Sequence, residues 1–425
     1  MIVSVLQGLR RFELRLRKSP HSHVPTGAFA GSALAADVQL YGIVDTGIGY
    51  NHIDMDSPGE DDVDNFRMES GQASGSRFGF KGTEDLGNGM TVGFILEDGI
   101  LSDTGVDDKV MFNRESSLFV QGNFGKFAMG RLGALNNGQS SWAKIGMISA
   151  FGTSDWGGFS AQLSNLMSLA GQWDNMIAYE TPDFAGFKVY AQYGMGSDSN
   201  ENESSSDRFY SLGVTYNNGP FAGYFAVDSI NYKTAKFGSN DWTGNKDDID
   251  DSLTVTLGGS YDFEVVKVYL GAQYFDEVKL SSVGGVVNKA GAADKIYKGK
   301  VDNKDVFFDT AYNAAIKIKG YGISLTADAP LAGGKAMFGV GYLDAESADS
   351  MDNAYASMPD MEDISNLDLK RYVVSVGYDY PFSKHTDVYA VASYMQDQVD
   401  ADTKAGSVEW EPSAYSLYVG LRHRF

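Results

Sequence analysis

The chain has 425 residues, a formal net charge of −22, 50 glycines, 24 tyrosines, 25 phenylalanines and no cysteine. The lack of cysteine excludes disulfides, thiolate metal sites and a cysteine nucleophile, and the acidic balance argues against nucleic acid as a partner, because phosphate binding needs concentrated Lys and Arg. No apolar run reaches 18 residues, which excludes a transmembrane helix.

Residues 1–35 have the layout of a secretory signal. Basic residues between Arg10 and Lys18 precede a weakly apolar stretch, and Ala33-Leu34-Ala35 supplies a small-x-small site. Pro25 and two glycines interrupt the apolar part. We therefore expect a degraded signal peptide, or one with a misplaced start, followed by a mature domain over residues 36–425.

Apolar and polar side chains alternate from Asp37 onward in segments of about ten residues, which predicts β-strands. In residues 89–97, for example, every second residue from Met90 to Leu96 is apolar. The pattern recurs over residues 187–193, 210–216, 266–274, 372–378 and 415–425, often with aromatic residues at the ends. Strands with one apolar and one polar face fit a sheet between lipid and water, and the aromatic ends fit interfacial girdles.

Short and long polar connections alternate between these segments. The short ones lie near residues 86–88, 122–125, 217–220, 262–264 and 381–384, and the long ones near 51–73, 134–173, 196–207, 231–250, 277–306, 347–367 and 397–411. Counting between them gives 16 strands that begin and end on the short-turn side, as a bacterial outer-membrane barrel requires. The sequence predicts an all-β, 16-stranded antiparallel transmembrane β-barrel with short periplasmic turns and long extracellular loops.

The strands of a soluble β-sandwich or β-propeller also alternate apolar and polar residues, but their apolar faces would need a second layer to pack against. The sequence supplies neither helices nor a second set of buried strands for that layer. The opposite strand face carries recurring Lys, Arg, Glu and Gln. A polar interior in so wide a barrel would be filled with water.

Segments along nearly the whole mature chain resemble the general, non-specific porins of Gram-negative bacteria, especially those of β-proteobacteria. They include residues 37–47 (DVQLYGIVDTG), 76–89 (SRFGFKGTEDLGNG), 113–114 (NR), 174–184 (DNMIAYETPDF) and 419–425 (VGLRHRF). The resemblance implies an outer-membrane homotrimer that lets small hydrophilic solutes diffuse passively. It also implies that Phe425 ends a strand presented to the barrel-assembly machinery.

A basic wall is expected inside the barrel. If Phe78 and Phe80 face lipid, then Arg77 and Lys81 face the lumen, because side chains alternate across a strand. Either charge in lipid would instead cost about 2–4 kcal/mol near the midplane. The resemblance assigns Arg77 and Arg114 to the basic wall, although the local pattern leaves the face of Arg114 open.

The connection 134–173 carries many more apolar residues than an exposed loop should. They include Trp142, Met147, Ile148, Phe151, Trp156, Phe159, Leu163, Leu166, Met167 and Leu169. The segment resembles the family's third loop, which folds into the barrel and narrows the channel. The resemblance makes Asp155 the carboxylate opposite the basic wall, with Trp156 and Lys144 in the same loop. Trp173 and Ala178 stand where the family has basic residues.

The acidic composition of the chain leads to expectations about ion selectivity and about binding partners. A strongly acidic chain raises the local concentration of cations, so we expect a cation preference. Acidic clusters such as residues 60–64 and 247–251 are either solvated loops or sites for divalent cations shared with lipopolysaccharide. Arg371, Arg422 and Arg424 are either wall charges or rim residues.

Other functions stay open on the same barrel. A substrate-selective channel for sugars or dicarboxylates would need a line of lumenal aromatic residues, for which Tyr190, Tyr269 and Tyr418 are candidates. A surface adhesin without an open pore is a further alternative. The five scattered histidines form no metal motif, and no catalytic set, phosphate loop or cofactor motif occurs.

Overall fold

A computed structural model describes residues 37–56, 62–107, 110–196, 207–232, 236–237, 242–243, 250–289, 296–301, 304–308, 316–351, 364–403 and 406–425. The predicted signal segment, residues 1–35, lies outside the described residues, as do residues 60–61 and 247–249 of the two acidic clusters. All that follows concerns the domain that begins at Asp37.

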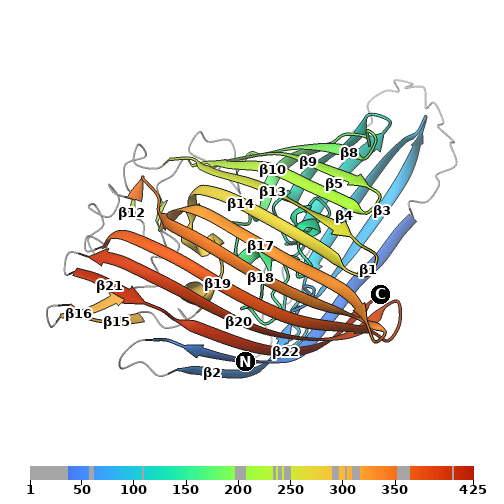
Figure 1. The fold of residues 1–425 in the computed structure, drawn as a ribbon. Helices are drawn as coiled ribbons and strands as arrows, with labels where there is room; N and C mark the ends of the chain where they lie inside the picture. Colours follow the sequence, from blue (N-terminus) through green and yellow to red (C-terminus); the bar gives the residue numbers. More distant parts are fainter. Residues whose placement is uncertain are drawn as a thin grey trace, which may run out of the picture. The chain divides into compact units, whose positions relative to one another are not determined.

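Sixteen antiparallel strands close into one barrel, which confirms the predicted fold class (Figure 1). Each strand pairs with the next along the chain, and the last closes against the first from Ile43 opposite Arg424 to Asp54 opposite Ser413. The strands are β1 (Asp37–Asp54), β3 (Arg77–Gly87), β4 (Met90–Gly99), β5 (Glu115–Gly122), β6 (Gly125–Gly133), β7 (Gln172–Glu180), β8 (Phe187–Gly194), β9 (Arg208–Asn218), β10 (Phe221–Asn231), β13 (Ser252–Asp262), β14 (Lys267–Lys279), β17 (Lys317–Leu331), β18 (Gly334–Ser347), β19 (Ile364–Pro381), β20 (Thr386–Thr403) and β22 (Ser413–Arg424).

Additional elements lie at the long-loop end. Strand β2 (Val63–Ser70) pairs with the outer half of β1, and β21 (Gly406–Trp410) pairs with the end of β20. The predicted loops 51–73 and 397–411 are therefore largely hairpins that extend the barrel. A further long connection, residues 100–114, joins β4 to β5 and was not predicted.

Small hairpins and short helices complete the described structure. They are β11 (Lys236–Phe237) with β12 (Trp242–Thr243), β15 (Ile296–Val301) with β16 (Lys304–Phe308), the 3-10 helices η1 (Ile145–Ile148), η2 (Leu163–Asn165) and η5 (Leu280–Ser282), and α1 (Val286–Lys289). Within the described ranges, no helix has the length and apolar character needed to cross a bilayer.

Burial in the strands is the reverse of that in a soluble protein. On β22 the apolar side chains of Leu417 and Leu421 are 53% and 51% exposed, whereas Ser416, Tyr418 and Arg422 are buried. Apolar residues thus point outward and polar residues inward, as a barrel in lipid demands. Outward tyrosines on β19 are Tyr372, midway along the strand, and Tyr380, next to the short turn.

Candidate pore constriction

The connection between β6 and β7, residues 134–171, lies inside the barrel and is called the constriction loop here. Its backbone amides donate hydrogen bonds to inward-facing side chains of β8, β14, β17 and β19. The pairs are Leu135 N to Gln192 Oε1 (3.0 Å), Ser168 N to Gln273 Oε1 (2.7 Å), Ala150 N to Thr326 Oγ1 (2.8 Å) and Ala161 N to Ser375 Oγ (2.8 Å). The predicted inward fold of the third loop is confirmed, and β7 begins at Gln172, slightly before the predicted loop end.

Inward glycines on the wall let the constriction loop lie directly against it. A Cβ atom at Gly322 would be 1.6 Å from the carbonyl oxygen of Leu166, and one at Gly341 would be 2.2 Å from its Cδ1. At Gly339 a Cβ would be 2.9 Å from the ring of Phe151. No side chain fits between loop and wall at these positions, so the loop is a packed part of the barrel.

A second long connection also folds inward, which the sequence did not predict. Leu280, Val283 and Val286 are fully buried, and Gly284 N donates to the carbonyl of Ser164 in the constriction loop at 2.8 Å. Beneath this segment, Arg371 binds Asp397 through Nε at 2.6 Å and Nη2 at 3.0 Å. Arg371 is therefore a wall charge rather than a rim residue.

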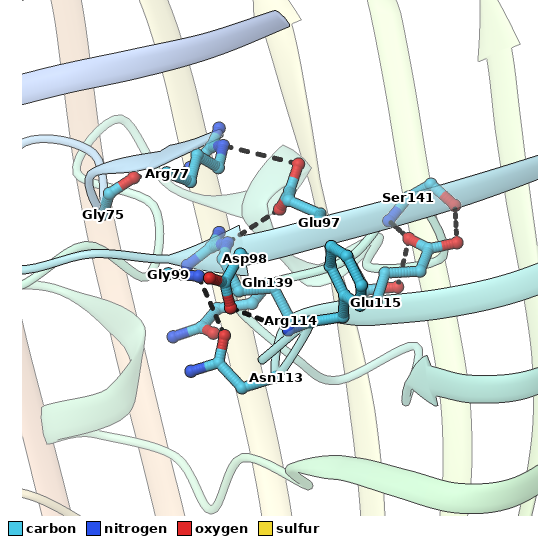
Figure 2. Close-up of polar contacts among 12 residues, drawn as sticks. Gly75, Arg77, Glu97, Asp98, Gly99, Asn113, Arg114, Glu115, Gln139 and Ser141 are labelled. Carbon is cyan, nitrogen blue, oxygen red and sulfur yellow. Dashed lines mark hydrogen bonds and ion pairs between the residues drawn. The ribbon is translucent and has the colours of Figure 1, made fainter. Parts of the chain in front are cut away.

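The basic wall contains a carboxylate that the sequence did not single out (Figure 2). Glu97 on β4 accepts a hydrogen bond from Arg114 Nε at 2.7 Å, and its other oxygen lies 3.6 Å from Arg77 Nε. The hydroxyl of Tyr41 donates to the same carboxylate at 3.0 Å. Arg77 and Arg114 are thus brought together, and with Glu97 they carry a net single positive charge.

Three lysines in the lumen carry charges that no carboxylate pairs. The Nζ atoms of Lys81, Lys126 and Lys144 lie 5.0, 4.4 and 5.4 Å from the ring centroids of Tyr41, Phe119 and Tyr190. None of the three forms an ion pair within the described part of the chain. We call Lys81, Lys126 and Lys144 the lysine row. Lys126 was missed from the sequence, although it lies on the lumenal side of β6.

Asp155 and Trp156 lie where the constriction loop meets the segment that leads to Arg77. The amide of Trp156 donates to the carbonyl of Gln72 at 2.8 Å, and its indole Nε1 donates to the carbonyl of Phe151 at 2.6 Å. Asp155 is exposed and accepts a hydrogen bond from Gln162 Nε2 at 3.3 Å. Its role as the carboxylate opposite Arg77 stays a prediction.

Comparison with known proteins assigns the family. A sequence model described as Gram-negative porin matches residues 24–400. The chain belongs to the Gram-negative porin family. An outer membrane porin protein of Bordetella pertussis is 31% identical over 93% of this chain and 97% of its own length, and outer membrane porin protein 32 of Delftia acidovorans is 29% identical over 94% and 97%.

Solved structures share the fold of this porin. The anion-selective porin from Comamonas acidovorans has a TM-score of 0.61 at 24% identity, covering 92% of this chain and 100% of its own. OmpT of Vibrio cholerae, in a structure described as the trimer form, has a TM-score of 0.53 at 18% identity, covering 92% and 100%. The porin is an outer-membrane protein and a channel, not an enzyme.

The chain turns into the lumen of the porin at residues 71–76, which connect β2 to β3. Asp45 on β1 holds this segment by accepting the amides of Ala73 at 3.0 Å and Ser74 at 2.7 Å, and it accepts the hydroxyl of Tyr389 at 2.6 Å. Arg422 donates to the carbonyl of Ala73 at 3.3 Å. Asp45 was missed because its partner Tyr389 is distant in sequence.

Arg422 is a wall charge, like Arg371, because it is buried and also binds Asp387. Arg424, at the end of β22, keeps 37% of its side chain exposed and binds the same carboxylate. Of the two alternatives for these arginines, Arg371 and Arg422 are wall charges and Arg424 is a rim residue.

The tyrosine candidates do not form a line along the lumen of the porin. Tyr190, Tyr269 and Tyr418 are buried on β8, β14 and β22, and their hydroxyls lie at 3.2 Å from Thr215 Oγ1, 2.7 Å from Asp328 Oδ2 and 2.9 Å from the carbonyl of Glu69. These contacts are wall packing. Phe425 closes the seam, where its amide and carbonyl pair with Gly42 at 3.1 Å each. Its role in assembly stays a prediction, as does contact with lipopolysaccharide.

Proposed function

We propose that this porin forms a water-filled channel for passive diffusion of small hydrophilic solutes and ions, and that the lysine row gives it a preference for anions. The constriction loop narrows the passage, so charges beside the loop act on a passing ion more strongly than charges elsewhere. Lys144 belongs to the loop itself, and Lys126 lies 5.1 Å from the ring of the loop residue Trp142.

Two carboxylates lie near the lysine row. Glu180 is neutralised by Lys188 at 2.5 Å, whereas Glu115 accepts hydrogen bonds only from neutral donors, such as Ser140 Oγ at 3.1 Å and the amide of Ser141 at 2.8 Å, and keeps its charge. The three lysines and Glu115 together therefore carry a net charge of +2, and this local positive excess carries the proposal.

The net charge of −22 leads to the opposite expectation, a cation preference. Charges separated by more than about 8 Å of physiological salt solution are largely screened. Acidic groups in the outer loops therefore act weakly on an ion at the constriction, and the local lysines outweigh them.

Reversal potentials of the porin in planar bilayers under a potassium chloride gradient will decide between these two expectations. We expect a potential of the sign that marks chloride as the more permeant ion. The opposite sign would favour control by net charge, and an absence of conductance would favour the non-conducting adhesin. Liposome swelling with sugars of graded size will test the general pore against a substrate-selective one.

We also propose a homotrimer whose subunits meet along β3 to β6. No tyrosine occurs between Tyr50 and Tyr179 in the sequence, so these strands lack the tyrosines that mark a lipid interface elsewhere on the barrel. Their outward face is nevertheless apolar and exposed, with Leu118 and Met129 on β5 and β6. An apolar face without an interfacial girdle suits contact with protein better than contact with headgroups.

Cross-linking will test the subunit contact, because the natural chain has no cysteine. Met129→Cys is expected to give covalent dimers with a short bis-maleimide in outer membranes. Leu270→Cys, on an equally exposed outward site of β14, is the matched control and should give none. Equal cross-linking at both sites would contradict the proposed contact.

A further inference from the structure

A cavity of about 210 Å³ lies inside the barrel on the long-loop side of the constriction loop. Its floor is the end of that loop, from Ser168 to Gly171, and its walls are the inner faces of β9, β10, β13 and β14. Ligand pockets for drug-sized molecules occupy about 300–1,000 Å³. This cavity is smaller, so it suits a solute of only a few heavy atoms.

Asp228 on β10 forms part of the cavity wall and lacks a counter-ion. It is 3% exposed, and its Oδ2 accepts a hydrogen bond from Asn136 Nδ2 at 2.6 Å. The hydroxyls of Ser211 and of Thr254, the cross-strand neighbour that also lines the cavity, interact with the same carboxylate. Within the described residues Asp228 forms no ion pair. A buried carboxylate without a counter-ion is costly even when it is hydrogen-bonded, and a positively charged ligand beside it would lower that cost.

Three aromatic residues, Trp173, Phe209 and Tyr232, also line the cavity, as does a second carboxylate, Asp207. Trp173 is half-buried and stacks on Phe209 with 5.1 Å between centroids and 17° between planes. One face of the Tyr232 ring is taken by Lys317, whose Nζ lies 4.1 Å from the centroid, so Trp173 is the aromatic side chain left for a ligand. Aromatic faces beside a carboxylate are the surroundings that bind organic ammonium groups.

We propose that this cavity binds small primary alkylammonium ions on their way to the constriction. The carboxylate of Asp228 attracts the positive charge, the serine and threonine hydroxyls accept its N–H groups, and Trp173 covers the alkyl part. Lys279 also lines the cavity, but its side chain is exposed and extends toward solvent. The site would slow the passage of ammonium solutes through the outer mouth of a channel that otherwise favours anions. This effect on passage rests on the proposed channel function, whereas binding in the cavity does not.

Propylammonium chloride is the probe in two measurements on the full-length porin. Added to the long-loop side of planar bilayers carrying sodium chloride current, it should reduce the current in a saturable manner. In Asp228→Asn the concentration for half block should rise about fivefold or more, the effect of one unit charge at about 4 Å in water. Asp262→Asn, the same change at an exposed turn residue of the opposite end, should leave it unchanged.

Binding of propylammonium to the detergent-solubilised porin, measured by ligand-observed NMR, separates this site from the channel proposal. Loss of binding in Asp228→Asn with sodium chloride current retained supports the site. Equal block and equal binding in Asp228→Asn and the natural protein would overturn it, as would equal block by the uncharged analogue propanol. If the porin binds propylammonium through Asp228 but passes no current, the channel proposal is wrong and the proposed site stands.

Discussion

Asp397→Ala is expected to lower the free energy of unfolding of the barrel by about 3–5 kcal/mol, because it leaves the Arg371 guanidinium buried and unpaired. Both side chains are 0% exposed. The pair also joins two inward segments, since Arg371 Nη1 donates to the carbonyl of Asn165 at 2.7 Å and Asp397 Oδ2 accepts the amide of Val287 at 2.9 Å. Equilibrium unfolding in urea from lipid vesicles will measure the loss.

Two comparisons sharpen this test. Asp349→Ala removes a partner of Lys319 that is 83% exposed, so it should cost no more than about 1 kcal/mol. The double variant Arg371→Met with Asp397→Leu removes both charges together and should recover much of the stability lost in Asp397→Ala. Similar losses for Asp397→Ala and Asp349→Ala would contradict a buried structural role for the pair.

Most of the barrel could be predicted because its determinant is local. A period of two with an apolar outer face is visible within each strand, and the turns at residues 86–88 and 381–384 fix where strands reverse. The same logic extends to cross-strand pairs. Arg371 and Asp397 are equidistant from the turn after Pro381, so their pairing could have been read from the register of this hairpin.

The predicted loop 51–73 was partly wrong for a related reason. Residues 63–70 were assigned to a loop because they are polar, yet they pair with β1 as a hairpin that extends past the barrel. A strand with water on both faces needs no apolar face, so period-two hydrophobicity cannot detect it. Backbone hydrogen bonds to β1 hold this strand in place.

The candidate site could be predicted less well because its contacts join distant parts of the chain. Arg77 and Lys81 were placed by alternation, but Glu97 between the two arginines depends on the pairing of β3 with β4 and on the return of the chain at Arg114. The inward segment at 280–289 rests on Arg371 and Asp397 from other strands. One signal was available: the inward glycines Gly322 and Gly341 leave a strip on the wall that only a close-packed loop could fill.

Lys126→Glu combined with Lys144→Glu is expected to turn the anion preference into a cation preference, with the permeability ratio of chloride to potassium falling about tenfold or more. A unit charge at about 4 Å changes an equilibrium about fivefold even in water, and each substitution changes the local charge by two. Reversal potentials under a salt gradient will measure the ratio, and they should show the largest shift at low ionic strength.

The control for this variant separates local charge from net charge. Lys370→Glu with Lys384→Glu changes the net charge by the same amount, but Lys370 faces outward on β19 and Lys384 lies in an exposed turn. If the lysine row governs selectivity, the control keeps the natural reversal potential. If both double variants shift the reversal potential equally, selectivity follows the charge of the whole protein. The lysines beside the constriction loop would then lie too far from the path of the permeating ion to control selectivity.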